Sequence, residues 1–506
     1  MADQQTAAIL YTFLLCLLSL HLFWVWKRSG TKKKVPPGPS GLPIIGNLHQ
    51  LGSMPHLTLA RLAETYGPLI HLKMGQVPTL VVSSAKMAEE IMKTHDLTFC
   101  SRPALLSPRH LHYECSGIVF APYGPYWRNV RRICVQELLR AKRVELESFR
   151  IVREAEVGHM IDTITSSSKA GKLVNLSEMF LSFSSNVICG VAYGKRYWED
   201  GSELSEMMAQ TDRLFGGFFV GDFFPYLDWV KYVTGLKRRL DKCFTIRDAF
   251  LEKVIDDHLL PSRGEIKDDQ KDLVDVLLQL QKDGALEFPL TRDNIKAVVM
   301  DMFGAGIDTT SAILEWGMSE LVKNPRVMQK AQEEVRRIVK SNHINKIKET
   351  DLHQFQYLKA VVKEIMRLHP PGPLLVPRES MEDCEIEGYH IPAKTRVLIN
   401  AWAIGRHPDS WEDPEEFKPE RFMDSSIDYR GQDFQLIPFG AGRRVCPGLS
   451  FGVTVLELTL ANLLLHFEWG LPDGLNPNDL DMAEAFGLVV HRKSHLLLEA
   501  TPLSAF

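Results

Sequence analysis

The stretch PFGAGRRVCPG, residues 438–448, places a single cysteine in a short, basic and rigid frame. Arg443 and Arg444 lie just before Cys446, and glycines and prolines surround it. A structural cysteine more often has apolar neighbours, and a nucleophilic cysteine usually has a histidine nearby. The segment fits neither description, so it indicates another use for the thiol.

The residues after this loop predict what that use is. From residue 449 to residue 469 the sequence LSFGVTVLELTLANLLLHFEW is apolar and helix-like, so Cys446 lies at the entrance of a buried helix. The helix dipole and the free backbone N–H groups at such an end stabilise a thiolate. Gly440, Gly442 and Gly448 allow the backbone to turn tightly and to pass close to a flat group. A thiolate held in this way is a good metal ligand.

Length and composition predict a globular body, and amphipathic helical patterns from Leu57 onward, interrupted by Gly and Pro, predict that it is mainly α-helical with a small β portion. The chain has 506 residues, 45% of them hydrophobic, and a formal net charge of −4, so the total charge does not indicate nucleic acid or a strongly charged substrate. Residues 78–84 and 395–401 are the clearest β-like pieces. The 8 cysteines form no C-x-x-C pair, which argues against a zinc site or a disulfide framework and fits a reducing compartment.

The N-terminus predicts a membrane anchor. Residues 7–26 carry no Asp, Glu, Lys or Arg, and as a helix they would span about 30 Å, the thickness of a bilayer core. A cleaved signal peptide is the alternative, but MADQQ lacks a basic stretch and no small-residue cleavage site follows. The basic residues after the apolar stretch favour a cytosolic location for everything that follows: Lys27, Arg28, Lys32, Lys33 and Lys34. We therefore expect a single-pass anchor at residues 1–28, a basic and proline-rich hinge at 29–50 and a cytosolic domain at 51–506.

The loop around Cys446 resembles the haem-binding loop of the cytochromes P-450, with the pattern F-x-x-G-x-R-x-C-x-G. Phe439, Gly442, Arg444, Cys446 and Gly448 occupy the fixed positions. The resemblance implies a cytochrome P-450 fold for residues 51–506, a haem b cofactor, and the Cys446 thiolate as the axial ligand of the iron. It also implies that Arg444 pairs with a haem propionate.

Other segments match the same family in the same order. Glu364 and Arg367 match its E-x-x-R, and with Arg421 of PERF they are expected to form a structural ion network. In YGPYWRNVRR, Trp127 and Arg131 match its W-x-x-x-R and are expected, one helical turn apart, to reach the same propionate. Arg378 is a further propionate partner by resemblance.

The segment MDMFGAGIDTTSAILEW, residues 300–316, decides between oxygen chemistry and simple haem binding. Gly304 and Gly306 fall inside a helical pattern at a cost of about 1 kcal/mol each. The A-G-x-D-T-T match implies the family's central helix, with a bulge that makes room for dioxygen and with Asp308 and Thr309 as the acid–alcohol pair that delivers protons. Thr309 favours monooxygenation over peroxide rearrangement.

Two electrons must come from a separate donor, because the chain has no flavin or nicotinamide fingerprint. The anchor indicates the NADPH–cytochrome reductase of the endoplasmic reticulum, with cytochrome b5 as a second partner that the resemblance allows. A basic cluster is a candidate dock for an acidic partner, with a solvated helix face as the alternative: Arg128, Arg132, Arg140, Lys142 and Arg143.

The matched segments look most like plant microsomal enzymes of specialised metabolism, whose substrates include terpenoids, alkaloids, phenylpropanoids and flavonoids. Family position predicts a mostly apolar pocket, which implies a hydrophobic substrate held by shape, with His112 as a candidate polar anchor. Gly117 departs from the family, which often has an acidic residue there. The predicted pocket residues are Leu111, His112, Ile118, Phe120, Met302, Phe303, Ala305, Leu374, Leu375, Val376, Phe486 and Leu488.

Two questions remain open on the sequence. The aromatic segment GGFFVGDFFPYLDWV, residues 216–230, is either core or a piece that dips into the membrane and receives apolar substrates. A non-catalytic haem-thiolate sensor, or a membrane scaffold for a metabolic complex, is the alternative to a monooxygenase, and the intact pair of Asp308 and Thr309 argues against it.

Overall fold

The computed structural model of the chain describes residues 19, 34–139, 147–196, 210–211, 214–217, 219–264, 266–267, 270–284, 288–342 and 346–503. The expected anchor, apart from Ser19, and the first residues of the hinge lie outside the described residues. The same is true of Arg140, Lys142 and Arg143 in the basic cluster.

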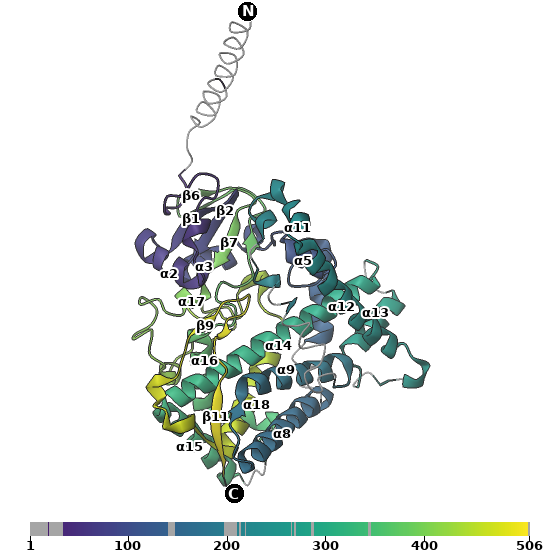
Figure 1. Cartoon of the computed structure of the whole chain (residues 1–506), viewed down its shortest axis with the longest axis vertical. Coiled ribbons are helices and arrows are strands. Elements are labelled where there is room, and N and C mark those ends of the chain that lie inside the picture. The colour runs from purple at the N-terminus through teal and green to yellow at the C-terminus, as the bar shows by residue number, and fades with distance from the viewer. Residues whose placement is uncertain are drawn as a thin grey trace, which may run out of the picture.

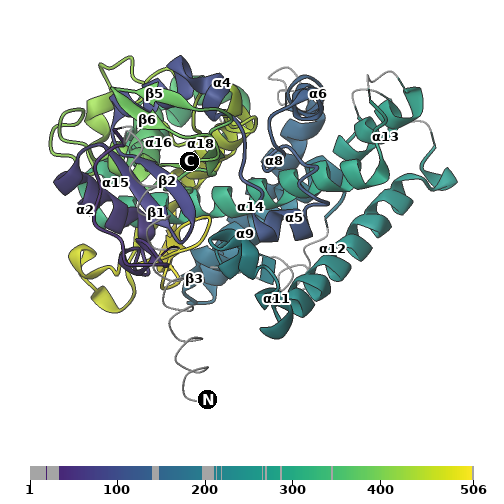
Figure 2. The same cartoon turned by 90° about the horizontal axis from the view of Figure 1, so that it is seen from above.

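Helices make up most of the described body, and they pack around one long central helix, α14 (Figures 1 and 2). α14 spans Arg292–Lys323 and begins with a reciprocal cap, in which the side chains of Thr291 and Asn294 each accept a hydrogen bond from the other's backbone N–H. It packs most extensively against α9, and also against α13, α16 and α18. The other helices are α2 (Pro55–Tyr66), α3 (Ala85–Glu89), α4 (Asp96–Phe99), α5 (Leu106–Leu111), α6 (Pro125–Ile133), α8 (Glu147–Lys169), α9 (Leu176–Tyr193), α11 (Val230–Val233), α12 (Leu236–His258), α13 (Leu273–Asp283), α15 (Pro325–Ser341), α16 (Gln356–Leu368), α17 (Ala401–Ile404) and α18 (Leu449–His466).

The β portion is small and lies mainly at one end of the body. β1 (Leu69–Met74) and β2 (Val77–Val82) form an antiparallel hairpin, β2 pairs in parallel with β7 (Arg396–Ile399), and β4 (Arg378–Glu379) completes the sheet. The two β-like pieces expected from the sequence are thus neighbouring strands. The remaining sheets are β3 (Val174–Asn175) with β11 (Leu497–Pro502) and β8 (Phe467–Gly470), β5 (Cys384–Ile386) with β6 (Tyr389–Ile391), and β9 (Glu484–Ala485) with β10 (His491–Arg492).

Two long, apolar helices lie in the core of the described body. α14 and α18 are each long and apolar enough to cross a membrane, but 67% and 72% of their most apolar windows are buried inside the protein. Their hydrophobicity is therefore explained by packing against neighbouring helices. The described cysteines form no disulfide with one another.

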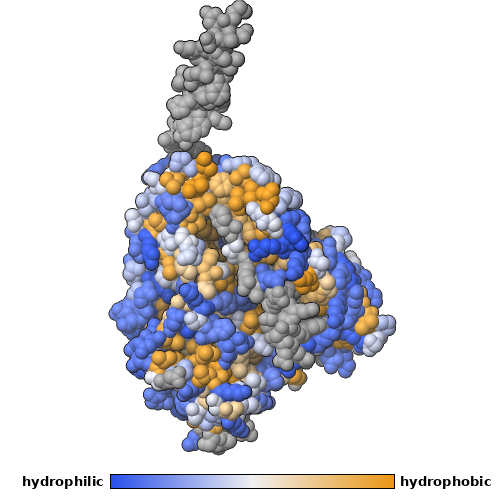
Figure 3. Space-filling view, in the orientation of Figure 1, coloured by the Kyte–Doolittle hydropathy of each residue, from blue (hydrophilic) through white to orange (hydrophobic). Residues whose placement is uncertain are grey.

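Apolar side chains are exposed at the end of the body that holds β1 and β2 (Figure 3). Two segments meet the turn between these strands: Gly75 N donates to Ile45 O, and Gln76 N donates to Phe223 O. The exposed apolar residues of these segments are Leu42, Ile44, Ile45, Tyr226, Trp229, Tyr232 and Val233. Phe219 and Phe224 of the second segment are instead buried, so the aromatic stretch at 216–230 is partly core and partly surface.

Candidate active site

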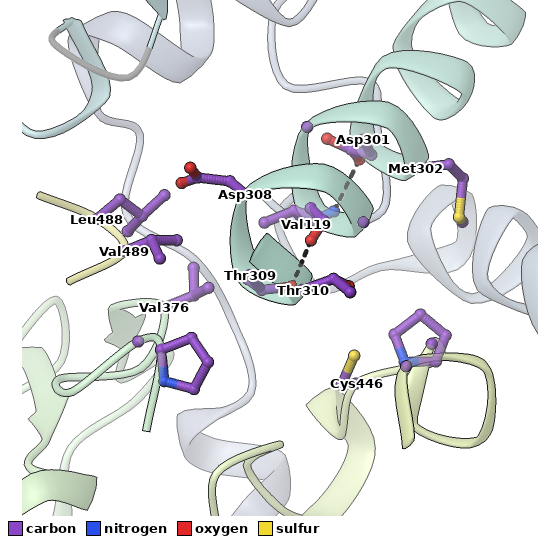
Figure 4. A pocket seen from close by; sticks show the side chains of 18 of the residues that line it. Val119, Asp301, Met302, Asp308, Thr309, Thr310, Val376, Cys446, Leu488 and Val489 are labelled. Carbon is purple, nitrogen blue, oxygen red and sulfur yellow. Dashed lines mark hydrogen bonds between the residues drawn. The ribbon is translucent and has the colours of Figure 1, made fainter. Parts of the chain in front are cut away.

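A cavity of about 720 Å³ lies between the middle of α14 and the loop that carries Cys446 (Figure 4). Residues far apart in the sequence line it, including Cys446, Thr309 and Val376. In Figure 4 the Cys446 side chain points across the cavity toward the turn of α14 that holds Thr309 and Thr310. The loop and the helix thus form opposite walls.

The cysteine loop is held by backbone geometry. Gly440 and Gly442 have φ angles of +68° and +66°, which favour glycine, and Cys446 N donates to Phe439 O at 2.9 Å. A Cβ at Gly442 would lie 2.2 Å from Met92 O, so no side chain fits there. Gly442 therefore shapes the loop without lining the cavity, whereas Phe439 lines it.

The thiol lies where the sequence places it, just before the first turn of α18. Burial raises the pKa of Cys446, whereas a hydrogen bond with the backbone N–H of Gly448 and the nearby charge of Arg131 lower it. Burial has the largest effect, so the protein alone favours the neutral thiol. A metal ion at the sulfur would favour the thiolate, because a coordinating thiol is deprotonated.

Four guanidinium groups converge on the cavity wall beside this loop: Arg102, Arg131, Arg378 and Arg444. Most of their hydrogen bonds go to backbone carbonyls; Arg444, for example, donates to Cys100 O and Ala121 O, both at 2.7 Å. Burial, together with the repulsion between these arginines, lowers the pKa of Arg102 and lowers that of Arg444 to about 9.

Within the described residues, the carboxylate that contacts this group is that of Asp96, 3.2 Å from Arg378. Asp96 also pairs with Arg443, at 2.9 Å. The wall therefore has an excess of buried positive charge that favours a ligand with two carboxylates. The thiol and this wall together fit haem, whose propionates would supply the missing negative charge.

Sequence reasoning missed Arg102, which is buried and donates to Val119 O and Val376 O. The only signal in the sequence was an arginine between Ser101 and Pro103, two residues after Cys100. A buried charged side chain needs a partner for its charge.

Trp127 lies beside the arginine wall, and its contact with a propionate stays a prediction. Trp127 Nε1 donates to Ile118 O at 2.9 Å and the residue does not line the cavity. Its ring instead lies 3.9 Å from the Arg444 guanidinium and 5.8 Å from that of Arg131. α6 thus holds Trp127 as a platform beneath two of the arginines.

The A-G-x-D-T-T segment lies on the cavity side of α14, but the expected bulge is absent, because α14 is a continuous α-helix. Two glycines make the room instead. A Cβ at Gly304 would meet nothing within 4 Å and would point into open space, whereas one at Gly306 would lie 2.5 Å from Ile188 of α9. Gly304 therefore keeps the cavity open, and Gly306 lets α9 pack closely.

Asp308 and Thr309 both line the cavity. Thr309 Oγ1 donates to Ala305 O at 2.6 Å, one helical turn earlier. Asp308 Oδ1 lies 2.8 Å from Nε2 of His491, a residue of β10 that sequence reasoning did not single out. Little in the sequence pointed to His491, because the strand that brings it to α14 is only two residues long.

Glu364, Arg367 and Arg421 form the expected ion network. Arg367 donates to both carboxylate oxygens of Glu364, at 2.7 and 2.8 Å, and Arg421 Nε donates to it at 3.0 Å. The Glu364 and Arg367 side chains are fully buried. Arg367 also donates to Gly405 O and Pro414 O, so the network ties α16 to the segment that precedes the cysteine loop.

Most of the predicted substrate residues line the cavity: His112, Ile118, Phe120, Met302, Ala305, Leu375, Val376, Phe486 and Leu488. Leu111, Phe303 and Leu374 do not. Leu111 packs against Leu214 and Leu240, and Leu374 packs against the core of the β1–β2 sheet. Phe303 faces Tyr193 of α9, because adjacent helical residues point about 100° apart and Met302 and Ala305 hold the cavity side.

Of the basic cluster, Arg128 and Arg132 are described, and both are exposed on α6. α6 also carries Arg131, which lines the cavity. The exposed face therefore backs the wall at which a haem would bind.

Comparison with known proteins agrees with this geometry. A family model described as Cytochrome P450 matches residues 36–498. The chain is 50% identical over 497 residues to cytochrome P450 71AP13 of Prunus mume, covering 97% of this chain and 95% of the relative. It is 48% identical to strychnine-11-hydroxylase of Strychnos nux-vomica, covering 99% and 98%. A solved zebra fish cytochrome P450 with abiraterone matches 89% of this chain and 100% of its own, with 29% identity and a TM-score of 0.73.

Proposed function

Because the chain belongs to the cytochrome P450 family, we propose that it is a membrane-anchored monooxygenase that inserts one oxygen atom of O2 into a hydrophobic plant specialised metabolite. The observation that carries the proposal is a single cavity with Cys446 on one wall and Asp308 and Thr309 on the other. The relative named for the hydroxylation of strychnine, an alkaloid, supports a substrate of this class.

Different residues of the cavity would bind the haem, position the substrate and deliver protons. Cys446 would ligate the iron of haem b, and Arg102, Arg131, Arg378 and Arg444 would hold the propionates. The haem, when bound, would supply the activation of dioxygen. The protein's own part is to keep the other end of the cavity apolar, to position the substrate, and to deliver protons from α14.

Proton delivery is assigned to Asp308 and Thr309. The Thr309 hydroxyl is ordered by its bond to Ala305 O, and Asp308 is held by His491, whose ring is one-third exposed. His491 Nδ1 lies 4.0 Å from Glu315 Oε2, so a buried acid lies behind the imidazole. Asp308 is thus part of a polar chain that leads away from the cavity, as a proton donor requires.

For the chain outside the described body we propose the arrangement expected from the sequence. Residues 1–28 anchor the protein in the endoplasmic reticulum membrane, residues 29–50 form the hinge, and residues 51–506 form the cytosolic catalytic domain. Exposed Tyr226, Trp229 and Tyr232, on the face that also exposes Ile44 of the hinge, support a dip of residues 216–230 into the membrane. Complete release of the protein from liposomes after deletion of residues 1–30 would disprove the dip.

The electron donor is assigned to NADPH–cytochrome reductase, with cytochrome b5 as a second partner. The exposed Arg128 and Arg132 on α6, behind the haem wall, support a dock for an acidic flavodoxin-like surface.

Two measurements test the proposed function. Purified protein with added reductase is expected to consume NADPH when a substrate is present, and a plant metabolite library is expected to contain compounds that shift the haem absorption band. Haem binding without NADPH consumption for any compound that shifts the band would instead indicate a non-catalytic sensor.

A further inference from the structure

One polar pair in the cavity wall adjoins the arginine group through Val119, whose carbonyl accepts from Arg102 and whose N–H donates to Asp301. His112 and Asp301 both line the cavity, yet they are only 6% and 4% exposed. His112 Nδ1 lies 3.0 Å from Asp301 Oδ1. The other carboxylate oxygen, Oδ2, accepts a hydrogen bond from Val119 N at 3.0 Å (Figure 4). Both oxygens of Asp301 are therefore directed at fixed groups of the loop that faces α14.

This arrangement also explains the glycine at position 117. A Cβ at Gly117 would lie 2.1 Å from Asp301 Oδ2 and 2.7 Å from Asp301 Cγ. A side chain there would push the carboxylate out of place. The Asp301 carboxylate therefore occupies the space that a side chain at position 117, acidic or not, would need.

The second ring nitrogen of His112 is available to a ligand. Nδ1 faces Asp301, and Nε2 has no hydrogen-bond partner among the residues that the structure describes. Phe120 and Phe215 meet the imidazole ring edge-on, with centroids 5.6 and 5.1 Å away, and they stack on each other. The ring is thus fixed by aromatic contacts that offer no hydrogen bond to Nε2. Nε2 is not among the fully enclosed, unpartnered side-chain atoms of the described residues, so it is open to the cavity, where a ligand can supply its hydrogen-bond partner.

The neighbours of Nδ1 decide whether Nε2 donates or accepts. A carboxylate 3.0 Å away favours the tautomer with the proton on Nδ1, although the contact is bent and acts more by charge than as a linear hydrogen bond. Burial lowers the pKa of His112, and the charge of Arg247 lowers it further, whereas Asp301 raises it. The net lowering favours the neutral ring, in which Nε2 carries a lone pair and accepts.

We propose that His112 Nε2 accepts a hydrogen bond from the substrate, so that the cavity selects hydrophobic molecules that carry a hydroxyl or N–H group over ketones and hydrocarbons of the same shape. The inference rests on the proposed function and names the substrate class more closely. Asp301 lies eight residues before Thr309 on α14, about 12 Å along the helix axis. The anchored group therefore lies at the end of the substrate remote from the carbon that is oxidised.

Three probes of similar size test the proposal: 4-hexylphenol, which can donate, 4-hexylacetophenone, which only accepts, and hexylbenzene, which does neither. Dissociation constants are measured for the holoprotein from the ligand-induced shift of the haem band. The readout is the ratio of the ketone constant to the phenol constant. Since each variant meets the same probes, differences in their solubility cancel when these ratios are compared.

Two variants are expected to lower this ratio by different amounts. His112→Phe removes the acceptor and is expected to lower the ratio about tenfold, with hexylbenzene binding unchanged. Asp301→Asn keeps an oxygen for Val119 N and turns an N–H₂ group toward Nδ1. His112 then carries its proton on Nε2 and donates to either probe. The ratio falls below that of His112→Phe because the ketone oxygen is a stronger acceptor than the phenol oxygen.

Thr211→Val is the matched control. Thr211 also lines the cavity, but its hydroxyl contacts Cys243 Sγ at 3.5 Å, so this variant is expected to keep the wild-type ratio. A ratio within twofold of wild type in both His112→Phe and Asp301→Asn overturns the anchor. Wild-type protein that lacks the absorption band of thiolate-ligated haem refutes the proposed function instead, so the two failures are distinguishable.

Discussion

Replacing Glu364 by Gln is expected to destabilise the protein far more than the loss of one charge at its surface. The Glu364 carboxylate accepts four hydrogen bonds: two from Arg367, one from Arg421 Nε at 3.0 Å and one from Lys418 N at 2.8 Å. Its side chain and that of Arg367 are fully buried, and that of Arg421 is 9% exposed. Glutamine keeps the shape, but it leaves two guanidinium charges without a counter-charge.

The expected loss is about 3–5 kcal/mol in the free energy of unfolding, the usual result of removing one partner from a buried ion pair. The matched control is Glu89→Gln, because Glu89 pairs with Lys93 while both side chains are largely exposed. Such a pair contributes less than about 1 kcal/mol. Urea denaturation of both variants, followed by far-UV circular dichroism, measures the difference. A loss below about 1 kcal/mol for Glu364→Gln, equal to that of the control, would refute the assignment of this network as a structural support.

Three further predictions concern the loop, the oxygen site and a buried acid. Gly442→Ala, which adds a clash with Met92 O to an unfavourable φ, is expected to lower the thermal midpoint and the haem content more than Gly388→Ala, which has φ +75° and open space; equal effects would show that the contact is unimportant. Thr309→Ala is expected to retain the haem spectrum while releasing hydrogen peroxide in place of product, and an unchanged ratio of product to NADPH consumed would count against this role. Burial raises the pKa of Glu457 to about 7, so the stability associated with its neutral form is lost as pH rises from about 4.5 to 7; Glu457→Gln should stabilise the protein by up to about 3 kcal/mol above pH 7 and not in acid, and a gain that is independent of pH would exclude this cause.

The sequence predicted those parts of the site whose spacing is local. The Cys446 loop and the buried helix after it follow from contiguous residues. So do the E-x-x-R pair on α16 and the predominantly helical character of the chain. Neighbours three or four apart on a helix must share a face, so these predictions need no knowledge of the tertiary fold.

Features that depend on contacts between distant segments were out of reach. The W-x-x-x-R spacing did not predict that the indole N–H of Trp127 donates to Ile118 O. The partner of Asp308 is His491, 183 residues away on a two-residue strand. Phe303 points away from the cavity because of its position on the face of α14. The 3.6-residue period of the helix could have predicted this, whereas family position alone could not.

Arg102 is a site residue that no sequence motif identified. It lies outside every motif that was matched. Its importance appears only when four guanidinium groups, three of them on buried residues, meet on one wall beside a single carboxylate of the described residues. Gly117 is the reverse case, since the sequence identified the departure and only the position of Asp301 explains it.

The most direct test of the account is the absorption spectrum of the purified, reduced protein under carbon monoxide, recorded for the wild type and for Cys446→Ser. We expect the wild type to show the long-wavelength maximum of haem ligated by a thiolate, and the variant to lack it. A wild-type spectrum without that maximum, or a Cys446→Ser spectrum that retains it, would contradict the assignment of this sulfur as the ligand of the iron.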